Sequence, residues 1–412
     1  GIIKALTIGD KSSIAEEQSA NYRTAGLAHF LAISGMHMGM IALLVFFLFR
    51  ALLFPVGAGR YDLRKPAAIT ALAFTFAYFL ISGQSVSCIR AFVMTSLVLL
   101  GVLLNRRAIS LRLWAFAVLV VSVITPSAVV SPGFLMSFAA VLGLVTFYEQ
   151  FGSRLRHWLS QQSIAGKVGA YLVGVLVTDL VASLMTLPYS MYYFHQISVY
   201  TSLGNLLAAP VIAFWVMPAL LVFLISLPFG FGEYAVKPLA AGVDVINHIT
   251  VWVSSLPAAQ SGEGVGAMPD WSIFVLTLGL LWLCIWQSRW RRWGWLGIAA
   301  GLAGLYLAPA PDFVFDETGT TYAYKNAAGK LNLSPYHKNR FLSKMWTGTN
   351  KPAEDETLKC TKQSCIYKDR IEFGKGWLKL DGKEIAFKSG GYINLKNGIR
   401  YYRPEQSRSW NK

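Results

Sequence analysis

Of the 412 residues in the chain, 54% are hydrophobic and only 14% are charged, and the formal net charge is +16 at pH 7. Soluble domains carry about 25% charged residues, so this composition excludes an ordinary soluble globular protein. We predict a polytopic α-helical membrane protein followed by a small, mainly β domain.

Ten stretches of the sequence are apolar enough to form membrane-spanning helices. A helix rises about 1.5 Å per residue, so about 20 residues cross the roughly 30 Å hydrocarbon core of a bilayer. One stretch contains Asp244 and His248, and an interfacial helix is its alternative interpretation. The ten windows run over residues 29–49, 66–82, 86–104, 112–130, 133–148, 169–187, 203–227, 236–256, 271–287 and 294–309.

Basic residues occupy alternate loops between these windows. Short cytoplasmic loops accumulate Lys and Arg, and the intervening loops hold Arg90 as their sole basic residue. The alternation closes with ten crossings and predicts that both ends of the chain lie outside the cytoplasm. We expect three parts, which are an extracytoplasmic or interfacial lead-in (1–28), a transmembrane domain (29–310) and a C-terminal domain (311–412).

The chain begins with Gly1 rather than Met, and we expect an upstream part before it.

The last hundred or so residues predict a small β domain. Short alternating stretches there are separated by Asp381-Gly382 and Asn397-Gly398, which are typical of the turns of antiparallel hairpins. Cys360 and Cys365 lie in this part, and their spacing suits a small disulfide loop if the domain is outside the cytoplasm. Two free thiols are the alternative.

Four blocks of the sequence mix polar residues and glycines with the apolar windows. The first is Gly26-Leu-Ala-His-Phe-Leu-Ala-Ile-Ser-Gly-Met-His-Met-Gly39, preceded by a lead-in at residues 8–14. The others are Tyr78-Phe-Leu-Ile-Ser-Gly83 with Ser87-Cys-Ile-Arg-Ala91, Ser131-Pro-Gly-Phe-Leu-Met-Ser-Phe138, and Leu187-Pro-Tyr-Ser-Met-Tyr-Tyr-Phe-His195 with Asn205-Leu-Leu-Ala-Ala-Pro210. In this order, and together covering about residues 8–225, the blocks resemble the competence domain of ComEC-type proteins.

This resemblance implies a channel of the bacterial inner membrane through which single-stranded DNA enters during transformation. Full-length members also carry an upstream OB-like domain and a downstream metallo-β-lactamase-like domain. Residues 313–319 resemble the start of the latter, but the tail contains one of the chain's six histidines and lacks the ligand cluster of a hydrolytic metal centre. We therefore expect a degenerate, metal-free tail, no enzymatic activity and no cofactor.

The expected partners are single-stranded DNA, the lipid bilayer, a DNA receptor, and a cytoplasmic motor or single-stranded-DNA-binding protein. No phosphate-binding Gly-x4-Gly-Lys-Ser/Thr motif occurs, so another subunit must supply the energy. The oligomeric state stays open. The alternative function is a secondary transporter for a small solute.

Polar residues at the head of the first window are candidates for the DNA pathway. On one continuous helix Ser34 and His37 share a face, and His29 lies within about 80° of His37. The Gly35-x3-Gly39 spacing favours close packing of another helix. Lining of the pathway and plain hydrogen bonding between helices both remain open, and two histidines alone do not suffice for a metal site.

Arg90 is the one basic residue well inside an apolar window, and Asp179 is a carboxylate inside another. Burying an arginine near the centre of a spanning helix costs about 2.5–3.5 kcal/mol, so Arg90 needs a partner. It either contacts DNA phosphate in the pathway, or forms a structural pair with Asp179 or with backbone carbonyls, or lies at a helix end and reaches water. For Asp179 the salt bridge with Arg90 is favoured over a proton-coupled step.

Overall fold

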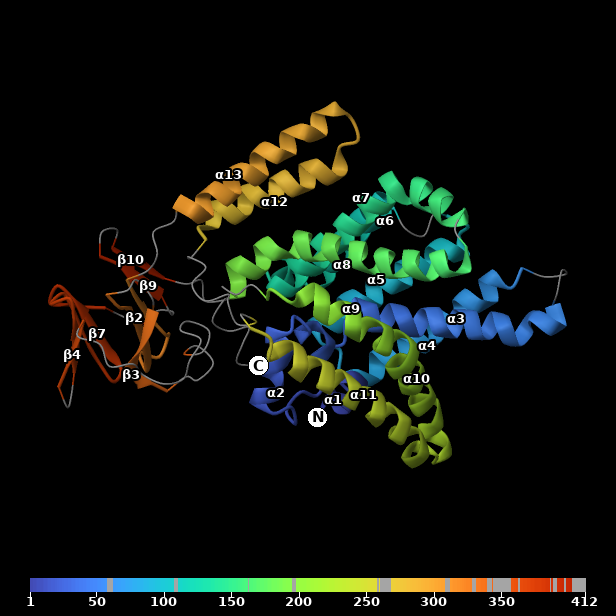
Figure 1. The fold of residues 1–412 in the computed structure, drawn as a ribbon, viewed down its shortest axis with the longest axis horizontal. Coiled ribbons are helices and arrows are strands. Elements are labelled where there is room, and N and C mark those ends of the chain that lie inside the picture. The colour runs from blue at the N-terminus through green and yellow to red at the C-terminus, as the bar shows by residue number, and fades with distance from the viewer. Residues whose placement is uncertain are drawn as a thin grey trace. The chain divides into compact units, whose positions relative to one another are not determined.

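The fold combines many helices with a β-rich C-terminal region (Figure 1). The structure is a computed structural model. It describes residues 1–57, 62–106, 110–161, 163–194, 198–257, 259, 268–307, 312–327, 331–338, 343, 357–361, 364–385, 387, 391–395 and 398–401.

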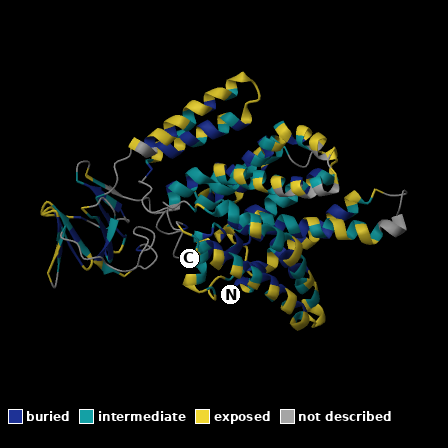
Figure 2. Ribbon diagram, in the orientation of Figure 1, coloured by how far each residue is buried: buried dark blue, intermediate teal, exposed yellow. Residues whose placement is uncertain are grey.

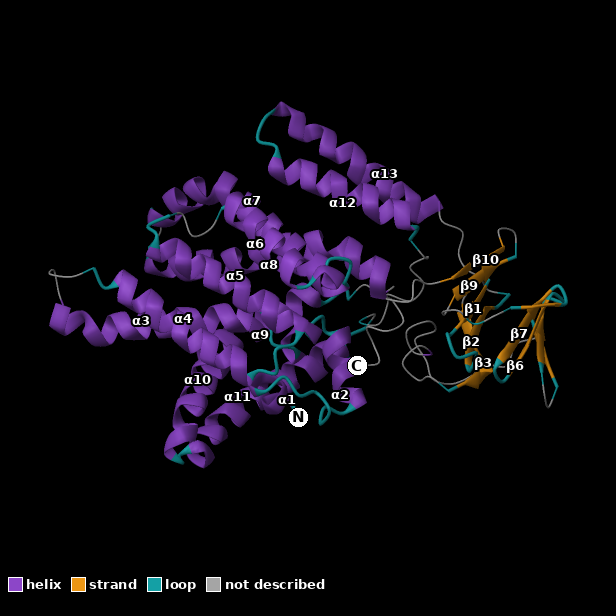
Figure 3. Cartoon of the chain, turned by 180° about the vertical axis from the view of Figure 1, so that it is seen from behind, coloured by secondary structure: helices purple, strands orange, loops and turns teal. Residues whose placement is uncertain are grey.

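Helices make up most of the chain before residue 308 (Figure 3). In chain order they are α1 (Ile2–Thr7), α2 (Glu16–Thr24), η1 (Ala28–Leu31), α3 (Gly35–Gly57), α4 (Arg64–Ile81), α5 (Val86–Leu103), α6 (Leu111–Ile124), η2 (Pro126–Ala128), α7 (Pro132–Ser160), α8 (Ile164–Phe194), α9 (Thr201–Val211), η3 (Ile212–Val216), α10 (Met217–Ser226), η4 (Leu227–Phe229), α11 (Gly232–Ser254), α12 (Asp270–Ile285), η5 (Arg289–Trp293) and α13 (Gly294–Leu307).

Each of the ten apolar windows coincides with a helix or with consecutive helical segments between α3 and α13. In the described part of the chain, five helical stretches are both long and apolar enough to cross a membrane, and α6 and α12 are shorter apolar helices. Ten crossings therefore stay a prediction. The five stretches are Gly35–Leu53, Val86–Leu103, Pro132–Leu155, Val173–Tyr193 and Thr201–Phe229.

The chain divides into two compact units. The first contains residues 1–186 and 198–259, and the second contains residues 187–197 and 260–412. The division puts α12 and α13 in the same unit as the β-rich region. The three-part organisation expected from the composition stays a prediction.

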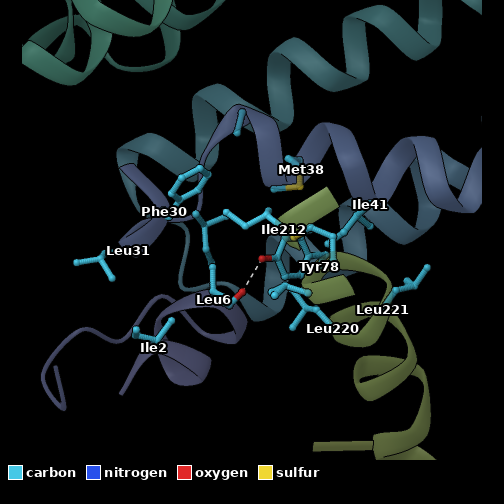
Figure 4. Packing of buried hydrophobic residues seen from close by; sticks show 14 of the residues in the cluster. Ile2, Leu6, Phe30, Leu31, Met38, Ile41, Tyr78, Ile212, Leu220 and Leu221 are labelled. Atoms are coloured by element: carbon cyan, nitrogen blue, oxygen red, sulfur yellow. Dashed lines mark hydrogen bonds between the residues drawn. The ribbon is translucent and has the colours of Figure 1, made fainter. Parts of the chain in front are cut away.

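In the first unit, α1 is attached to α4 by a buried hydrogen bond. The Tyr78 hydroxyl donates to the carbonyl oxygen of Leu6 at 2.6 Å, amid apolar side chains that include Met38 and Ile212 (Figure 4). Aromatic hydroxyl groups usually find such a partner when they are buried. The bond joins segments 72 residues apart in the sequence.

Two glycine turns meet beside this bond. Gly9 and Gly83 have φ angles of +76° and +73°, a region that glycine enters without a steric penalty. A Cβ atom on Gly9 would lie 2.8 Å from the oxygen of Ser82, and one on Gly83 would lie 2.9 Å from the oxygen of Ile8. The lead-in block and the second sequence block are therefore in direct backbone contact.

The lead-in also contacts α11. Tyr22 on α2 donates from its hydroxyl to Oδ1 of Asn247 at 2.8 Å, and Gln18 donates to the same oxygen at 3.1 Å. Burial raises the pKa of Tyr22 to about 12, so the hydroxyl keeps the proton that it donates. These bonds give the side-chain oxygen of Asn247 two donors from α2.

In the second unit, α12 and α13 pack through glycines. A Cβ on Gly279 would lie 2.7 Å from the nitrogen of Ile298 and 2.8 Å from the oxygen of Gly294, and one on Gly297 would lie 2.9 Å from the Cα of Gly279. Only glycines allow the two backbones to approach this closely. Many residues of both helices are exposed (Figure 2), and they include the large apolar residues Trp271, Phe274 and Leu296.

The β-rich region contains two antiparallel five-stranded sheets with strand orders β10-β9-β1-β2-β3 and β4-β5-β6-β7-β8. The predicted Asp381-Gly382 turn joins β7 to β8, and both of its residues have positive φ. The strands are β1 (Phe313–Phe315), β2 (Thr321–Lys325), β3 (Leu331–His337), β4 (Leu358–Cys360), β5 (Cys365–Tyr367), β6 (Ile371–Gly374), β7 (Trp377–Leu380), β8 (Lys383–Glu384), β9 (Gly391–Asn394) and β10 (Gly398–Tyr401).

Aromatic side chains fill the space between the two sheets. Phe313 of the first sheet meets Phe373 of the second with ring centroids 4.9 Å apart, and Tyr322 lies 4.8 Å from the same ring. All three are buried. Cys360 and Cys365, on β4 and β5, are joined in a disulfide.

Candidate functional site

Arg90 is almost completely buried, with 6% of its surface exposed. It lies in the second turn of α5, whose first residue follows the helix cap Ser85. One terminal nitrogen of its guanidinium donates to Oγ of Ser87 at 3.2 Å. Its Nε is also buried and has no hydrogen-bond partner among the described residues. The side chain therefore retains an unused donor inside the helical unit.

The guanidinium of Arg90 lies against the first turn of α7. A Cβ atom on Gly133 would be 2.9 and 3.0 Å from the two terminal nitrogens and 3.4 Å from Cζ. The helix begins there because Pro132 fits the first helical position and because Oγ of Ser131 accepts the N–H of Phe134 at 3.3 Å. Gly133 leaves the space that the flat guanidinium occupies.

The salt bridge expected between Arg90 and Asp179 is not formed, and that prediction was wrong. The ion pairs Lys359–Asp369 and Arg370–Asp381 belong to the β-rich region and include neither residue. Asp179, on α8, instead accepts a hydrogen bond from Nδ2 of Asn205 on α9. The second oxygen of Asp179 and Oδ1 of Asn205 are buried and have no donor among the described residues. An amide on α9 therefore takes the place that the arginine was expected to fill.

Ser34 and His37 are in contact, but the reason is a helix cap. The α3 helix begins at Gly35, not at the start of the apolar window. Ser34 Oγ lies 3.0 Å from Nδ1 of His37, and the N–H of Ser34 donates to the same nitrogen at 3.3 Å. The bond from the Ser34 N–H corresponds to one half of a capping box, in which the histidine ring takes the place of the usual Glu or Gln side chain.

His29 does not share a helix with His37, so the predicted common face of these residues is wrong. His29 lies in the separate turn η1, where its ring is tilted against that of Phe30 with the centroids 4.1 Å apart. It is exposed, whereas His37 is buried. It still interacts electrostatically with both Asp179 and His37. His29, His37 and Asp179 therefore lie near one another, although His29 and His37 belong to two separate helical segments.

Gly35 and Gly39 lie beside open space. A Cβ atom on either residue would meet no atom of the described residues within 4 Å, so these two glycines bring no helix of the described part of the chain close to α3. The small-residue packing expected here occurs instead between α12 and α13.

The sequence analysis did not select Gly133 and Asn205. Gly133 leaves room for the guanidinium of Arg90, and Asn205 donates a hydrogen bond to Asp179. Both stand inside the blocks that carried the family resemblance. A signal existed for Gly133, since a glycine directly after a helix-starting proline leaves room for a neighbouring side chain. Within the described residues, no group of three or more His, Cys, Asp and Glu side chains could hold a metal ion.

The apolar helices define a helical membrane protein. Residues 6–290 match the family model described as Competence protein, and the chain therefore belongs to that family, whose members act in DNA uptake.

Several curated proteins are similar to this chain. ComE operon protein 3 of Bacillus subtilis (strain 168) is 30% identical over 235 residues, which are 57% of this chain and 27% of that protein. Competence protein ComA of Neisseria gonorrhoeae is 26% identical over 267 residues, 62% of this chain and 36% of that protein. Recombination protein 2 of Haemophilus influenzae is 23% identical over 245 residues, 59% and 30% of the two chains. The chain thus spans about a third or less of these relatives, and no solved structure is significantly similar to it.

Proposed function

We propose that this chain is a membrane channel that carries single-stranded DNA into the bacterial cytoplasm during natural transformation. The observation that carries the proposal is the match to the Competence protein family over residues 6–290. Relatives named for competence and recombination support it.

The chemistry of the helical unit is consistent with a nucleic-acid path. Each nucleotide of single-stranded DNA brings one negative charge, and binding sites for it use cationic groups that follow the backbone. The chain has a net charge of +16. Arg90 in addition keeps a buried N–H without an acceptor among the described residues. Its helix and α7 both begin at loops that the charge pattern predicts to be extracytoplasmic, so Arg90 would stand near the entrance.

In this proposal the chain lies in the inner membrane with its C-terminal β-rich region outside the cytoplasm. It conducts DNA and does not hydrolyse it, and it needs no cofactor. A receptor delivers the DNA from outside, and a cytoplasmic motor or single-stranded-DNA-binding protein supplies the driving force. The purified chain with magnesium ions is then expected to leave a labelled oligonucleotide intact.

The test is the uptake of labelled DNA by competent cells. Deletion of the coding region for this chain should abolish the entry of label into a DNase-protected cytoplasmic pool, and a plasmid copy should restore it. Surface binding of DNA by the cells should persist, because the receptor is a different protein. Undiminished uptake in the deletion strain would favour the alternative, a transporter for a small solute, since loss of such a permease leaves transformation unchanged.

A further inference from the structure

Arg90 and the first turn of α7 place two positive groups side by side. The amino end of a helix carries about half a positive charge from its aligned peptide dipoles. The guanidinium of Arg90 occupies the space beside Gly133 at that end, where a Cβ atom would lie 2.9 Å from its nearest nitrogen. Arg90 is 6% exposed and forms no ion pair within the described residues. Such a pairing is unfavourable unless an anion is bound beside both groups.

The N–H groups of Arg90 and of the first turn of α7 also outnumber the acceptors that bind them. A guanidinium has five N–H groups, and only one bond from Arg90 to a described residue, that to Ser87, is formed. Its Nε–H is buried without an acceptor. In the first turn of α7, Pro132 has no N–H, and the N–H groups of Phe134 and Leu135 are already bound to Ser131. The N–H of Gly133 is the one that has no acceptor among the described residues.

From this geometry we infer that Arg90 and the amino end of α7 form one binding site for a phosphodiester group of the transported DNA. Guanidinium groups bind phosphate through two parallel hydrogen bonds, and the amino end of a helix binds anions through its free N–H groups. A phosphodiester offers two non-bridging oxygens that share one negative charge, enough for the Nε–H of Arg90 and the helix end together. The inference rests on the proposed function, because it names the DNA backbone as the ligand.

Gly133 has a definite part in this site. A side chain at this position would take the space of the guanidinium, since its Cβ would lie 2.9 Å from the nearest terminal nitrogen of Arg90. The glycine lets the arginine lie flat against the helix end, so that both sets of donors face the same group. Gly133→Ala should therefore weaken binding although it removes no charge.

The experiment measures the affinity of the purified full chain in detergent for a fluorescent single-stranded oligonucleotide. Arg90→Gln should weaken binding about tenfold, which is the loss expected for one charged hydrogen-bonded contact. Arg90→Lys should recover only part of the loss, because lysine keeps the charge without the fork of donors. Arg154→Gln is the matched control, since Arg154 is an exposed arginine on the same α7 helix, and it should change binding much less.

A second oligonucleotide isolates the phosphodiester contact. In this probe methylphosphonate linkages replace the charged phosphodiesters, and wild type and Arg90→Gln should bind it equally weakly. Equal thermal unfolding of all variants shows that the fold is kept; if Arg90→Gln unfolds, Gly133→Ala and Arg90→Lys carry the comparison. Equal affinity of wild type and all folded Arg90 and Gly133 variants for the charged oligonucleotide would overturn the inference.

Phospholipid also contains a phosphodiester, so the lipid phosphorus that is retained by each purified variant is measured beside its affinity for DNA. A lipid site predicts that wild type retains more phospholipid phosphorus than Arg90→Gln while both bind DNA equally, and that result overturns the inference. Failure of the wild type both to bind the oligonucleotide and to support uptake contradicts the proposed function itself. A wild type that does both, beside variants that match it, contradicts only the phosphodiester site.

Discussion

Tyr78 on α4 donates a hydrogen bond of 2.6 Å to the carbonyl oxygen of Leu6, and both groups are buried. The bond attaches the lead-in to the helical unit at a point where no water is available to replace it. The neighbouring Gly9 and Gly83 turns depend on the same close approach. The lead-in is therefore expected to be an integral part of the first unit.

Replacement of this hydroxyl gives the first prediction. Tyr78→Phe leaves the Leu6 oxygen buried without its donor, which costs about 1–3 kcal/mol. The free energy of unfolding of the full chain, titrated with denaturing detergent, should fall by this amount. Tyr200→Phe is the matched control, because the Tyr200 hydroxyl donates to the carbonyl oxygen of Pro257 at an exposed position outside the five spanning stretches, where water can replace the bond. Equal losses in the two variants would contradict the importance of burial.

Gly26 gives a prediction about backbone conformation. Its φ is +75°, and a Cβ atom there would overlap the side chain of Thr201 and lie 2.6 Å from the Cα of Thr201. Gly26→Ala is therefore strained both by its positive φ and by the overlap with Thr201. Because the Cα of Thr201 belongs to the backbone, no rotation of a side chain relieves that overlap. We expect a loss of more than about 2 kcal/mol and a reduced yield of folded chain in the membrane.

Gly39→Ala is the comparison for this variant. Gly39 has helical backbone and open space where the new Cβ would lie, so alanine should be neutral or stabilise the helix by up to about 1 kcal/mol. Normal folding of Gly26→Ala would show that the turn accommodates a side chain. A strong loss in Gly39→Ala would instead show that another molecule packs against this face of α3.

The contact between Asp179 and Asn205 predicts an asymmetric response to mutation. Asn205→Leu removes the donor to Asp179 and leaves a carboxylate whose other oxygen already has no donor among the described residues. This should cost about 1–3 kcal/mol. The double variant Asp179→Leu/Asn205→Leu removes both polar groups and should be more stable than Asn205→Leu alone. Additive losses in the cycle would contradict direct coupling of the two side chains.

Comparison of the sequence with the fold shows which features are local. The apolar windows predicted the helices because a long run of hydrophobic side chains within one segment favours a membrane-spanning helix without help from the rest of the chain. The start of α3 was misplaced since Ala32 and Ile33 continue the apolar run, although the cap at Ser34 and His37 stops the helix there. A Ser-x-x-His pattern is a weaker cap signal than Ser-x-x-Glu.

The partners of Arg90 and Asp179 were not predictable in this way. Opposite charges suggested a bridge, but the pairing of side chains depends on which helices are neighbours, and hydrophobic periodicity carries little information on that. The structure brings Gly133 to Arg90 and Asn205 to Asp179, over sequence separations that no local pattern spans.

The disulfide between Cys360 and Cys365 gives a prediction that bears on membrane orientation. If residues 311–412 lie outside the cytoplasm, as the loop charges predict, the two thiols should be oxidised in growing cells. In a Cys88→Ser/Cys284→Ser background, which removes the two buried free thiols, a maleimide reagent should label the denatured chain only after reduction. Labelling without reductant would indicate a reducing compartment and reverse the proposed orientation.

Cys365→Ser removes the disulfide, which closes a small loop with a sequence separation of 5. Chain entropy puts the cost of this loss at about 2 kcal/mol. Protease digestion of the full chain should therefore cut the β-rich region faster in this variant, with the helical unit digested at the wild-type rate.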